Sequence, residues 1–315
     1  MRRVLGFVAT LLALALVGLA AWVFTYKPAQ REAPDLTIDL TRERVERGSY
    51  LANTVLSCFA CHTQRDWSKW GGPMIGPHGA GGESWVKEYG FPGRLFATNL
   101  TSDPKTGLGE WTDGEILRAL REGIGRDGRG LFPIMPYAEY RRLSDEDAMA
   151  VVAYLRTLAP VDRSYPEPEI DFPMSFFSKL APEPLEAAVP EPDREEPAAY
   201  GEYLATVGGC RMCHTPIDFR HLPIEDQAFA GGQRFEGDWG VAVTANLTSH
   251  PEGIGNYTRE NFVNLFRSFR HGVAEEPARP GSVMPWLSLC DLEDADLHAI
   301  FAYLQTVPPL PDHAP

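Results

Sequence analysis

Two short runs of the chain carry two cysteines and a histidine at the same spacing. Residues 58–62 read Cys-Phe-Ala-Cys-His, and residues 210–214 read Cys-Arg-Met-Cys-His. Two thiols three positions apart can each add to one vinyl group of a haem, while the adjoining imidazole binds the iron. A redox dithiol or half of a zinc site uses the same cysteine pair, but zinc needs a second thiol or histidine pair at a suitable distance, which the sequence lacks. The motifs therefore predict two covalently bound haem c groups, held by Cys58, Cys61, His62, Cys210, Cys213 and His214.

The sequence around the two motifs is repeated as well. Residues 48–52 (GSYLA) precede the first motif, and residues 201–205 (GEYLA) precede the second. Residues 97–102 (ATNLTS) follow the first motif, and residues 244–249 (TANLTS) follow the second. A self-similar stretch that recurs once at this length indicates a tandem duplication, and each copy has about 110 residues, an ordinary size for a domain.

A second axial ligand is expected in the same place in each copy. Met135 lies in Phe-Pro-Ile-Met-Pro-Tyr, and Met284 lies in Val-Met-Pro-Trp, at nearly the same distance along the chain after its motif histidine. A thioether opposite histidine is the usual arrangement in a high-potential cytochrome c. Proline fixes its own φ and keeps its predecessor out of a helix, so a methionine before proline can be held rigidly in a loop. We therefore expect Met135 and Met284 to be the axial ligands opposite His62 and His214.

Other sulfur and imidazole groups are weaker candidates. Met212 lies inside the second motif, too close to its histidine to reach the opposite face, and His271 lies at the end of a predicted helix as an alternative ligand. Cys290 has no partner left for a disulfide within the chain, which predicts a buried structural thiol. The remaining methionines and histidines have no counterpart in the other copy: Met74, Met149, Met174, His78, His221, His250, His298 and His313.

The N-terminus predicts export from the cytoplasm. Arg2 and Arg3 precede an uncharged apolar run from Val4 to Phe24. As a helix this run would be about 31 Å long, which matches a hydrocarbon core of about 30 Å. The basic residues place its start in the cytoplasm and the rest of the chain on the periplasmic side of the membrane. A retained anchor is the prediction, and a cleaved signal is the alternative, because Ala20 and Ala21 supply small residues near a possible cleavage site.

Composition and helical patterns divide the rest of the chain. We expect a membrane anchor or signal in residues 1–27, a stalk in 28–41, and a Pro- and acid-rich interdomain linker in 161–196. The two repeated copies are module one, residues 42–160, and module two, residues 197–310. Helix starts are predicted at Thr112, Ser144, Thr258 and Asp291 from capping residues before apolar stripes.

The charge of the chain excludes one class of partner. The formal net charge is -14, which argues against binding nucleic acid and favours docking with a basic face of a protein partner. The alternative is that most of this charge simply keeps the protein soluble.

Three stretches resemble a known family. Residues 98–112 (TNLTSDPKTGLGEWT), 118–123 (RALREG) and 131–137 (LFPIMPY) are similar to the cytochrome c subunits of membrane-bound gluconate and alcohol dehydrogenases. The resemblance covers both modules and implies two tandem class I cytochrome c-like domains of mainly α fold, which in this chain would follow the predicted N-terminal transmembrane helix. It implies that the motif cysteines hold haem and that the motif histidine and the loop methionine bind iron. Subunits of that family commonly carry three haems and typically have no N-terminal membrane helix, so this chain would be a dihaem form.

The predicted function is electron transfer. The donor would be a periplasmic or membrane dehydrogenase or another respiratory complex, and the acceptor a quinone, an oxidase or a small soluble cytochrome. Histidine and methionine would fill both axial positions, so no iron position is open to a substrate and no catalytic residue is expected. The alternative is a peroxidase-like dihaem enzyme, which requires one open or displaceable ligand. A permanent subunit of a respiratory complex is a third possibility.

Overall fold

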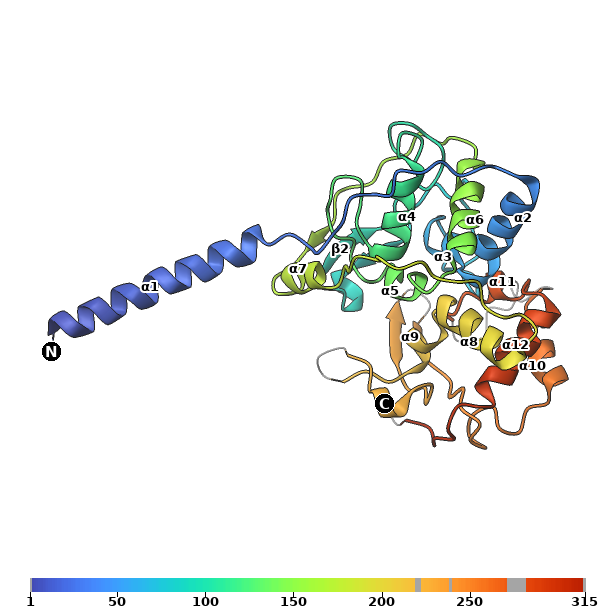
Figure 1. Ribbon diagram of the computed structural model, residues 1–315. Helices are drawn as coiled ribbons and strands as arrows, with labels where there is room; N and C mark the ends of the chain where they lie inside the picture. The colour runs from blue at the N-terminus through green and yellow to red at the C-terminus, as the bar shows by residue number, and fades with distance from the viewer. Residues whose placement is uncertain (1, 219–221, 238–239, 271–281, 314–315) are drawn as a thin grey trace.

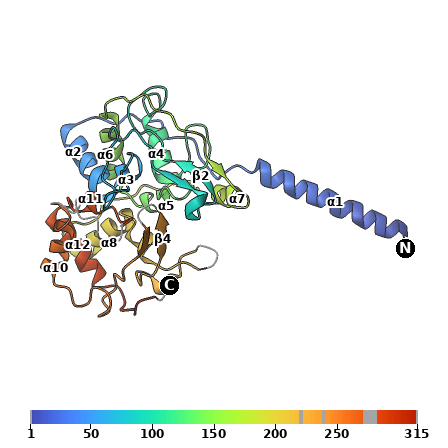
Figure 2. The ribbon, with the colours of Figure 1, turned by 180° about the vertical axis from the view of Figure 1, so that it is seen from behind.

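The computed structural model describes residues 2–218, 222–237, 240–270 and 282–313. Its first helix, α1 (Arg2–Thr25), projects away from the rest of the molecule, as Figures 1 and 2 show from opposite sides. The run is rich in Leu, Ala and Val, its large apolar side chains are exposed, and no proline interrupts the helix. Among the described residues, one helix is long and apolar enough to cross a membrane, over Arg3–Thr25. Its length and composition fit a membrane anchor and also a signal sequence.

Residues 28–41 form no helix or strand, and they lie along module one. The backbone N–H of Ile38 donates to Asp113 Oδ2 at 2.8 Å, and the Ile38 side chain is buried. Arg31 pairs with the buried carboxylate of Glu122 at 2.7 Å. The chain passes so close to Gly114 that a Cβ there would lie 1.8 Å from the carbonyl oxygen of Pro34. The segment after α1 is therefore fastened to module one over much of its length.

Module one is mainly helical, and its predicted helix starts at Thr112 and Ser144 are confirmed. Thr112 and Glu115 form a complete capping box, and the Ser144 hydroxyl accepts from the backbone N–H of Asp147 at 3.1 Å, which satisfies donors that the first turn leaves free. Figure 1 shows α2 and α6 side by side, and these helices share many contacts. The helices are α2 (Arg42–Tyr50), the π-helical turn η1 (Leu51–Val55), α3 (Cys58–Cys61), α4 (Asp113–Glu122), α5 (Tyr137–Tyr140) and α6 (Asp145–Arg156).

Module two has helices in the same order. Thr258 caps its helix as predicted, accepting from the backbone N–H of Asn261 at 3.1 Å. The start predicted at Asp291 is wrong, because the last helix begins at Asp294 with Glu293 as its N-cap, and Asp291 instead pairs with Arg270 at 3.0 Å. The helices are α8 (Pro197–Val207), α9 (Cys210–His214), α10 (Arg259–Arg267), α11 (Trp286–Leu289) and α12 (Asp294–Leu304).

Two small sheets complete the described structure. The first has the order β1-β2-β3, with both pairs antiparallel, and its third strand comes from the linker between the modules. The second is the antiparallel pair β4 and β5. The strands are β1 (Ser84–Val86), β2 (Gly93–Phe96), β3 (Glu169–Ile170), β4 (Arg234–Gly237) and β5 (Gly240–Val243). The remaining short helices are η2 (Lys87–Tyr89), α7 (Met174–Phe177), η3 (Ser178–Leu180) and η4 (Glu225–Gln227).

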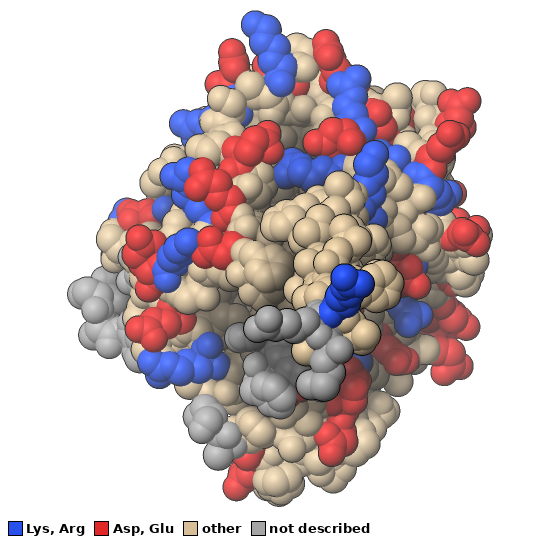
Figure 3. Space-filling view, turned by 90° about the vertical axis from the view of Figure 1, so that its left-hand side faces the viewer, with Lys and Arg blue, Asp and Glu red and all other residues tan. Residues whose placement is uncertain are grey.

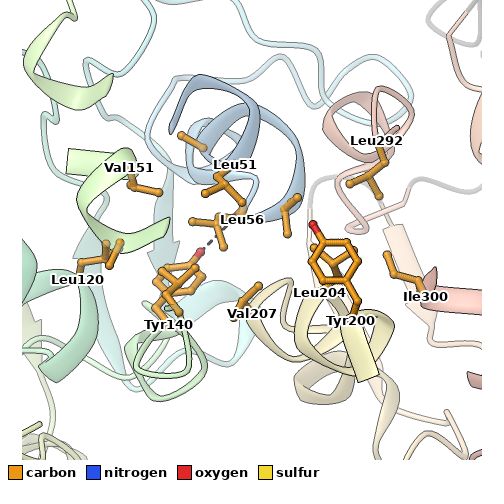
Figure 4. Close-up of a cluster of buried hydrophobic side chains, with 14 of the residues drawn as sticks. Leu51, Leu56, Leu120, Tyr140, Val151, Tyr200, Leu204, Val207, Leu292 and Ile300 are labelled. Carbon is orange, nitrogen blue, oxygen red and sulfur yellow. Dashed lines mark hydrogen bonds between the residues drawn. The ribbon is translucent and has the colours of Figure 1, made fainter. Parts of the chain in front are cut away.

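One apolar core runs through both modules. Leu51 and Leu56 of module one and Val207 and Leu292 of module two belong to the same cluster of buried side chains. Figure 4 shows Val207 reaching from α8 toward Leu56 and Tyr140. Because the two modules bury apolar surface against each other, the hydrophobic effect holds them together as well as folding each one.

The modules are also joined by two equivalent hydrogen-bonded pairs. Tyr50, in the GSYLA run of module one, donates to Asp296 Oδ2 of α12 at 2.6 Å. Tyr203, in the GEYLA run of module two, donates to Asp147 Oδ2 of α6 at 2.6 Å. Each tyrosine oxygen also accepts from the backbone N–H of the N-cap residue of that helix, at 3.0 Å and 3.3 Å. Each module thus contributes an equivalent tyrosine donor and an equivalent aspartate acceptor. The interface therefore has the two-fold pattern of an isologous contact.

Candidate haem-binding sites

The two C-x-x-C-H motifs form short helices that begin in the same way. Ser57, with φ 47°, precedes α3, and Gly209, with φ 68°, precedes α9. A left-handed residue at this point turns the chain sharply before the first cysteine. All five cysteines, which lie within the described residues, are free thiols. Each motif therefore presents two unbonded thiols on one turn of helix.

Desolvation raises the pKa of all four motif thiols. It raises the pKa of Cys58 and Cys210 to about 12. It also raises the pKa of Cys61 and Cys213 to about 11. A reactive dithiol needs a depressed pKa, because the thiolate is the nucleophile. The surroundings of both motifs are therefore unlike those of a redox dithiol.

A backbone carbonyl fixes the ring of each motif histidine. His62 Nδ1 lies 2.7 Å from the carbonyl oxygen of Thr98, and His214 Nδ1 lies 2.7 Å from that of Ala245. A carbonyl can only accept, so Nδ1 carries the proton and Nε2 keeps its lone pair. Burial lowers the pKa of both imidazoles, although the hydrogen bond to the carbonyl opposes this shift. Both rings are therefore neutral, with Nε2 free to bind a metal.

The repeated Asn-Leu-Thr-Ser run holds that carbonyl in place. Asn99 Oδ1 accepts from the backbone N–H of Thr101 at 2.9 Å, and Asn99 Nδ2 donates to the carbonyl of Val161 at 2.7 Å. Asn246 makes the same two bonds in module two, at 2.8 Å each. Each asparagine is buried and directly follows the residue whose carbonyl faces the histidine. Comparison of the two copies in the sequence identified this repeated run, but it did not show that the run fixes the carbonyl that faces the histidine.

A glycine N–H also binds the backbone carbonyl of each motif histidine. The backbone N–H of Gly81 donates to the carbonyl of His62 at 2.8 Å, and that of Gly231 donates to the carbonyl of His214 at 2.9 Å. Both glycines have positive φ, +78° and +72°. A Cβ at Gly81 would lie 2.5 Å from the carbonyl oxygen of Ala97. These positions need glycine for conformation and for space, and neither was singled out from the sequence.

The two predicted methionines lie in loops with the same backbone geometry. Each precedes a proline that caps a short helix, Pro136 with φ -80° and ψ 48°, and Pro285 with φ -78° and ψ 56°. The carbonyls of Met135 and Met284 each accept from the N–H two residues later, at 2.8 Å. Both side chains are half-buried and pack against the shared core. The loops therefore hold both thioethers at equivalent positions.

Two competing methionines lack the burial of Met135 and Met284. Met74 and Met212 are exposed. His271, the alternative ligand, and His221 lie outside the described residues. Within the part of the chain that the structure describes, no group of three His, Cys, Asp or Glu side chains could hold a metal ion. Cys290 is buried, as predicted for a structural thiol.

The two motifs lie close to each other across the interface between the modules. The chain just before the second motif touches the chain just before the first: a Cβ at Gly208 would lie 3.2 Å from the carbonyl oxygen of Val55. Glu139, four residues after Met135, lies close enough to Cys210 to contribute to its raised pKa. The short helix after each methionine loop contacts the other module, α5 against α8 and α11 against η1.

The donor set of each half fits haem c. Two free thiols on one helical turn match the two vinyl groups, and a neutral imidazole with a free Nε2 is the required proximal ligand. A half-buried thioether in a proline-fixed loop suits the opposite axial position.

Comparison with known proteins agrees with this chemistry. A family model described as cytochrome c matches residues 45–159. The alcohol dehydrogenase (quinone) cytochrome c subunit of Gluconacetobacter polyoxogenes is 32% identical over 293 residues, which cover 87% of this chain and 58% of that subunit. A diheme cytochrome c-type protein of Cereibacter sphaeroides is 29% identical over 306 residues, which cover 94% of this chain and 96% of that protein. Residues 45–159 are a cytochrome c domain, and the chain is similar along most of its length to multihaem cytochrome c subunits.

This similarity to multihaem cytochrome c subunits confirms the resemblance drawn from residues 98–137. A cytochrome c domain implies covalently bound haem c. The fructose dehydrogenase cytochrome subunit of Gluconobacter japonicus is also 32% identical, over 85% of this chain and 53% of that subunit. The chain thus spans little more than half the length of the dehydrogenase subunits that it matches.

Proposed function

We propose that the chain is a membrane-anchored dihaem c-type cytochrome that transfers electrons, built from two tandem class I cytochrome c-like domains, residues 42–160 and 197–310. α1 would be retained as the membrane anchor, with both domains on the periplasmic side. Residues 161–196 would be the interdomain linker, fastened to the first domain through β3. The haem-binding residues would be Cys58, Cys61, His62 and Met135 in the first domain, and Cys210, Cys213, His214 and Met284 in the second.

Each residue type has a defined task in this proposal. The cysteines would hold the macrocycle through thioether bonds, and His62 and His214 would bind iron through Nε2. Haem c, when bound, supplies a one-electron iron couple. The carbonyls of Thr98 and Ala245 orient the imidazoles and raise their basicity as ligands. The thioethers of Met135 and Met284 favour a high reduction potential and leave no position for a substrate.

The closeness of the two motifs across the interface carries this proposal. A carrier with two redox centres needs them near each other and held at a constant separation. A Cβ at Gly208, two residues before Cys210, would lie 3.2 Å from the carbonyl oxygen of Val55, three residues before Cys58. The reciprocal pairs of Tyr50 with Asp296 and Tyr203 with Asp147 support one fixed arrangement of the modules. Motifs at opposite ends of the molecule would not have supported electron exchange within one chain.

The relatives support a dehydrogenase as the electron donor. Two of them are named as cytochrome subunits of alcohol and fructose dehydrogenases, and we extend that type of partner to this chain. The acceptor would be a quinone, an oxidase or a small soluble cytochrome. The net charge of -14 favours a basic docking face on at least one partner.

A spectroscopic redox titration of the purified protein tests the proposal. We expect two low-spin haems and a methionine-to-ferric-iron charge-transfer band. Met135→Leu and Met284→Leu should each remove about half of that band, and the exposed Met74→Leu is the matched control that should leave it unchanged. A high-spin haem in the unaltered protein, or turnover of peroxide, would contradict the carrier and favour the peroxidase-like alternative.

A further inference from the structure

The linker between the modules carries a short apolar helix, α7, that touches α1. The ring centroid of Phe176 lies 5.5 Å from that of Trp22 and 5.8 Å from that of Tyr26, in edge-to-face geometry. Trp22 and Tyr26 also contact each other at 5.5 Å. α7 therefore rests against the end of α1 that is nearest to module one (Figure 1).

Large apolar side chains beside this contact are exposed. Phe172 is 66% exposed, Phe177 is 53% exposed and Leu180 is 49% exposed. Together with Phe176 they form what we call the α7 patch. Three such side chains within nine residues are more than the scattered apolar residues of an ordinary protein surface, and a patch of this kind marks a contact with a partner or a membrane.

The acidic residues near the α7 patch are paired with bases. Asp171 forms an ion pair with Lys87 at 2.6 Å, and Glu169 forms one with Arg94 at 2.7 Å. Figure 3 looks at the face from which α1 projects toward the viewer, and acidic and basic residues are interspersed over this face around that helix. The charges of these two carboxylates are therefore balanced by the Lys87 and Arg94 side chains. This pairing lowers the free-energy cost of bringing the carboxylates close to lipid.

The position of α7 relative to α1 sets its depth in a membrane. Trp and Tyr concentrate at membrane–water interfaces, where their amphipathic rings lie among the headgroups. Trp22 and Tyr26 mark that level on α1, and Phe176 lies at the same level because it touches both rings. Residues 28–41 and the bond from the backbone N–H of Asp171 to the carbonyl of Pro92, at 2.9 Å, fasten α1 and α7 to module one.

We propose that the α7 patch inserts into the interface of the same membrane that α1 spans. Module one would then have two membrane contacts and a fixed orientation above the bilayer, whereas a single helix would leave it free to tilt. The inference rests on the proposed function, in which α1 is a retained membrane helix. The bilayer is favoured over a protein partner because the patch is continuous with the aromatic end of α1.

Spin labelling of the full haem-loaded chain in lipid nanodiscs tests this inference. The label is placed at Phe177→Cys or Leu180→Cys in a Cys290→Ser background, where no other free thiol remains once both haems are attached. Thr157→Cys, exposed at the end of α6, is the control. The ratio of oxygen to nickel-chelate accessibility should be several-fold higher at 177 and 180 than at 157. Equal ratios in a protein that stays in the nanodisc would overturn the inference and leave the anchor intact, whereas loss of the chain from the nanodisc would overturn both.

Variants of the patch give a second readout. In oriented membranes, the EPR signals of the ferric haems should show a narrow distribution of angles to the membrane plane. Phe172→Ser together with Phe177→Ser should broaden it, and Tyr257→Ser, which removes an exposed aromatic ring from module two, should not. An unchanged distribution in the double variant contradicts the proposal, and unchanged haem spectra establish that the variant is folded.

Discussion

The imidazole of each motif histidine has its tautomer set by a backbone carbonyl. Every residue has a backbone carbonyl, so residue type alone could not identify Thr98 and Ala245 as the residues whose carbonyls accept from the histidines. What the sequence does contain is the asparagine that holds the carbonyl, found at the same place in both modules. Candidate iron ligands can be proposed from the sequence because C-x-x-C-H and Met-Pro name particular side chains, whereas the groups that orient the histidines act through the backbone.

Asn99 offers a direct test of this arrangement. Asn99→Ala removes the acceptor of the Thr101 N–H and the donor to the Val161 carbonyl, both in a buried turn. Buried groups that lose a partner cost about 1–3 kcal/mol each, so we expect the free energy of unfolding to fall by about 2 kcal/mol. Guanidinium unfolding followed by circular dichroism measures the change. Asn256→Ala, at an exposed position, should cost little, and an equal loss in both variants would contradict the assigned role.

Asp147 predicts a pH dependence of stability. Burial opposes its charge, but Arg47, bonded at 2.8 Å to each carboxylate oxygen, and Tyr203 hold the pKa of Asp147 below its usual value. The folded-state pKa is therefore lower than the unfolded value of about 3.9. The stabilisation is complete above that value and disappears as the pH falls through the folded-state pKa. Asp147→Asn should cost about 2 kcal/mol at neutral pH.

The pH profile separates this charge effect from simple loss of packing. The gap between the unaltered protein and Asp147→Asn should narrow below a pH of about 4, as measured by denaturant unfolding at a series of pH values. Glu146→Gln is the neighbouring control, because Glu146 is half-exposed and pairs with Arg44 on the surface. A gap that stays constant down to pH 3 would show that the carboxylate charge is not what stabilises this helix start.

At the scale of elements, the amphipathic helices were predictable and the small sheets were not. Thr112 and Ser144 start helices as their capping residues indicate. β1, β2 and β3 are only two to four residues long, too short for a period-two pattern to emerge, and β3 pairs with a strand far away in the sequence. The start of α12 was misplaced because several acidic residues in a row offer competing caps, and Asp291 is engaged by Arg270.

Substitutions at Gly81 and Gly90 allow the cost of left-handed backbone strain to be measured separately from the cost of a steric clash. Gly81 and Gly90 have nearly the same φ, +78° and +80°, but a Cβ at Gly81 would meet the Ala97 carbonyl oxygen at 2.5 Å, while nothing lies within 4 Å at Gly90. Gly90→Ala should therefore cost only the left-handed strain, about 1–2 kcal/mol. Gly81→Ala should cost a further 1–3 kcal/mol, roughly the cost of overpacking. Thermal unfolding of the two variants measures the difference, and equal costs would show that the loop behind His62 can relax.

At the scale of the whole molecule, the modules form one unit through contacts that no local pattern encodes. Tyr50 and Asp296 are far apart in the sequence, and each looks like an ordinary helix residue when taken alone. The repeat did contain a signal, because the same tyrosine and the same acidic helix start occur in both modules. That signal identifies equivalent residues, but it cannot say that they pair across the interface rather than within one module. The shared core around Leu56 and Val207 was hidden for the same reason.

The two reciprocal pairs should differ in strength despite their similar geometry. Asp147 keeps both bonds from Arg47 when Tyr203 loses its hydroxyl, whereas Tyr50 is the one side-chain donor to Asp296 among the described residues. We therefore expect Tyr50→Phe to cost about 2 kcal/mol and Tyr203→Phe about 1 kcal/mol, with Tyr257→Phe, an exposed tyrosine, as the neutral control. Because the apolar core is continuous, unfolding of both variants should remain a single transition when haem absorbance and circular dichroism are followed together. Separate transitions for the two modules would mean that the tyrosine pairs, and not the shared core, hold the haem sites together.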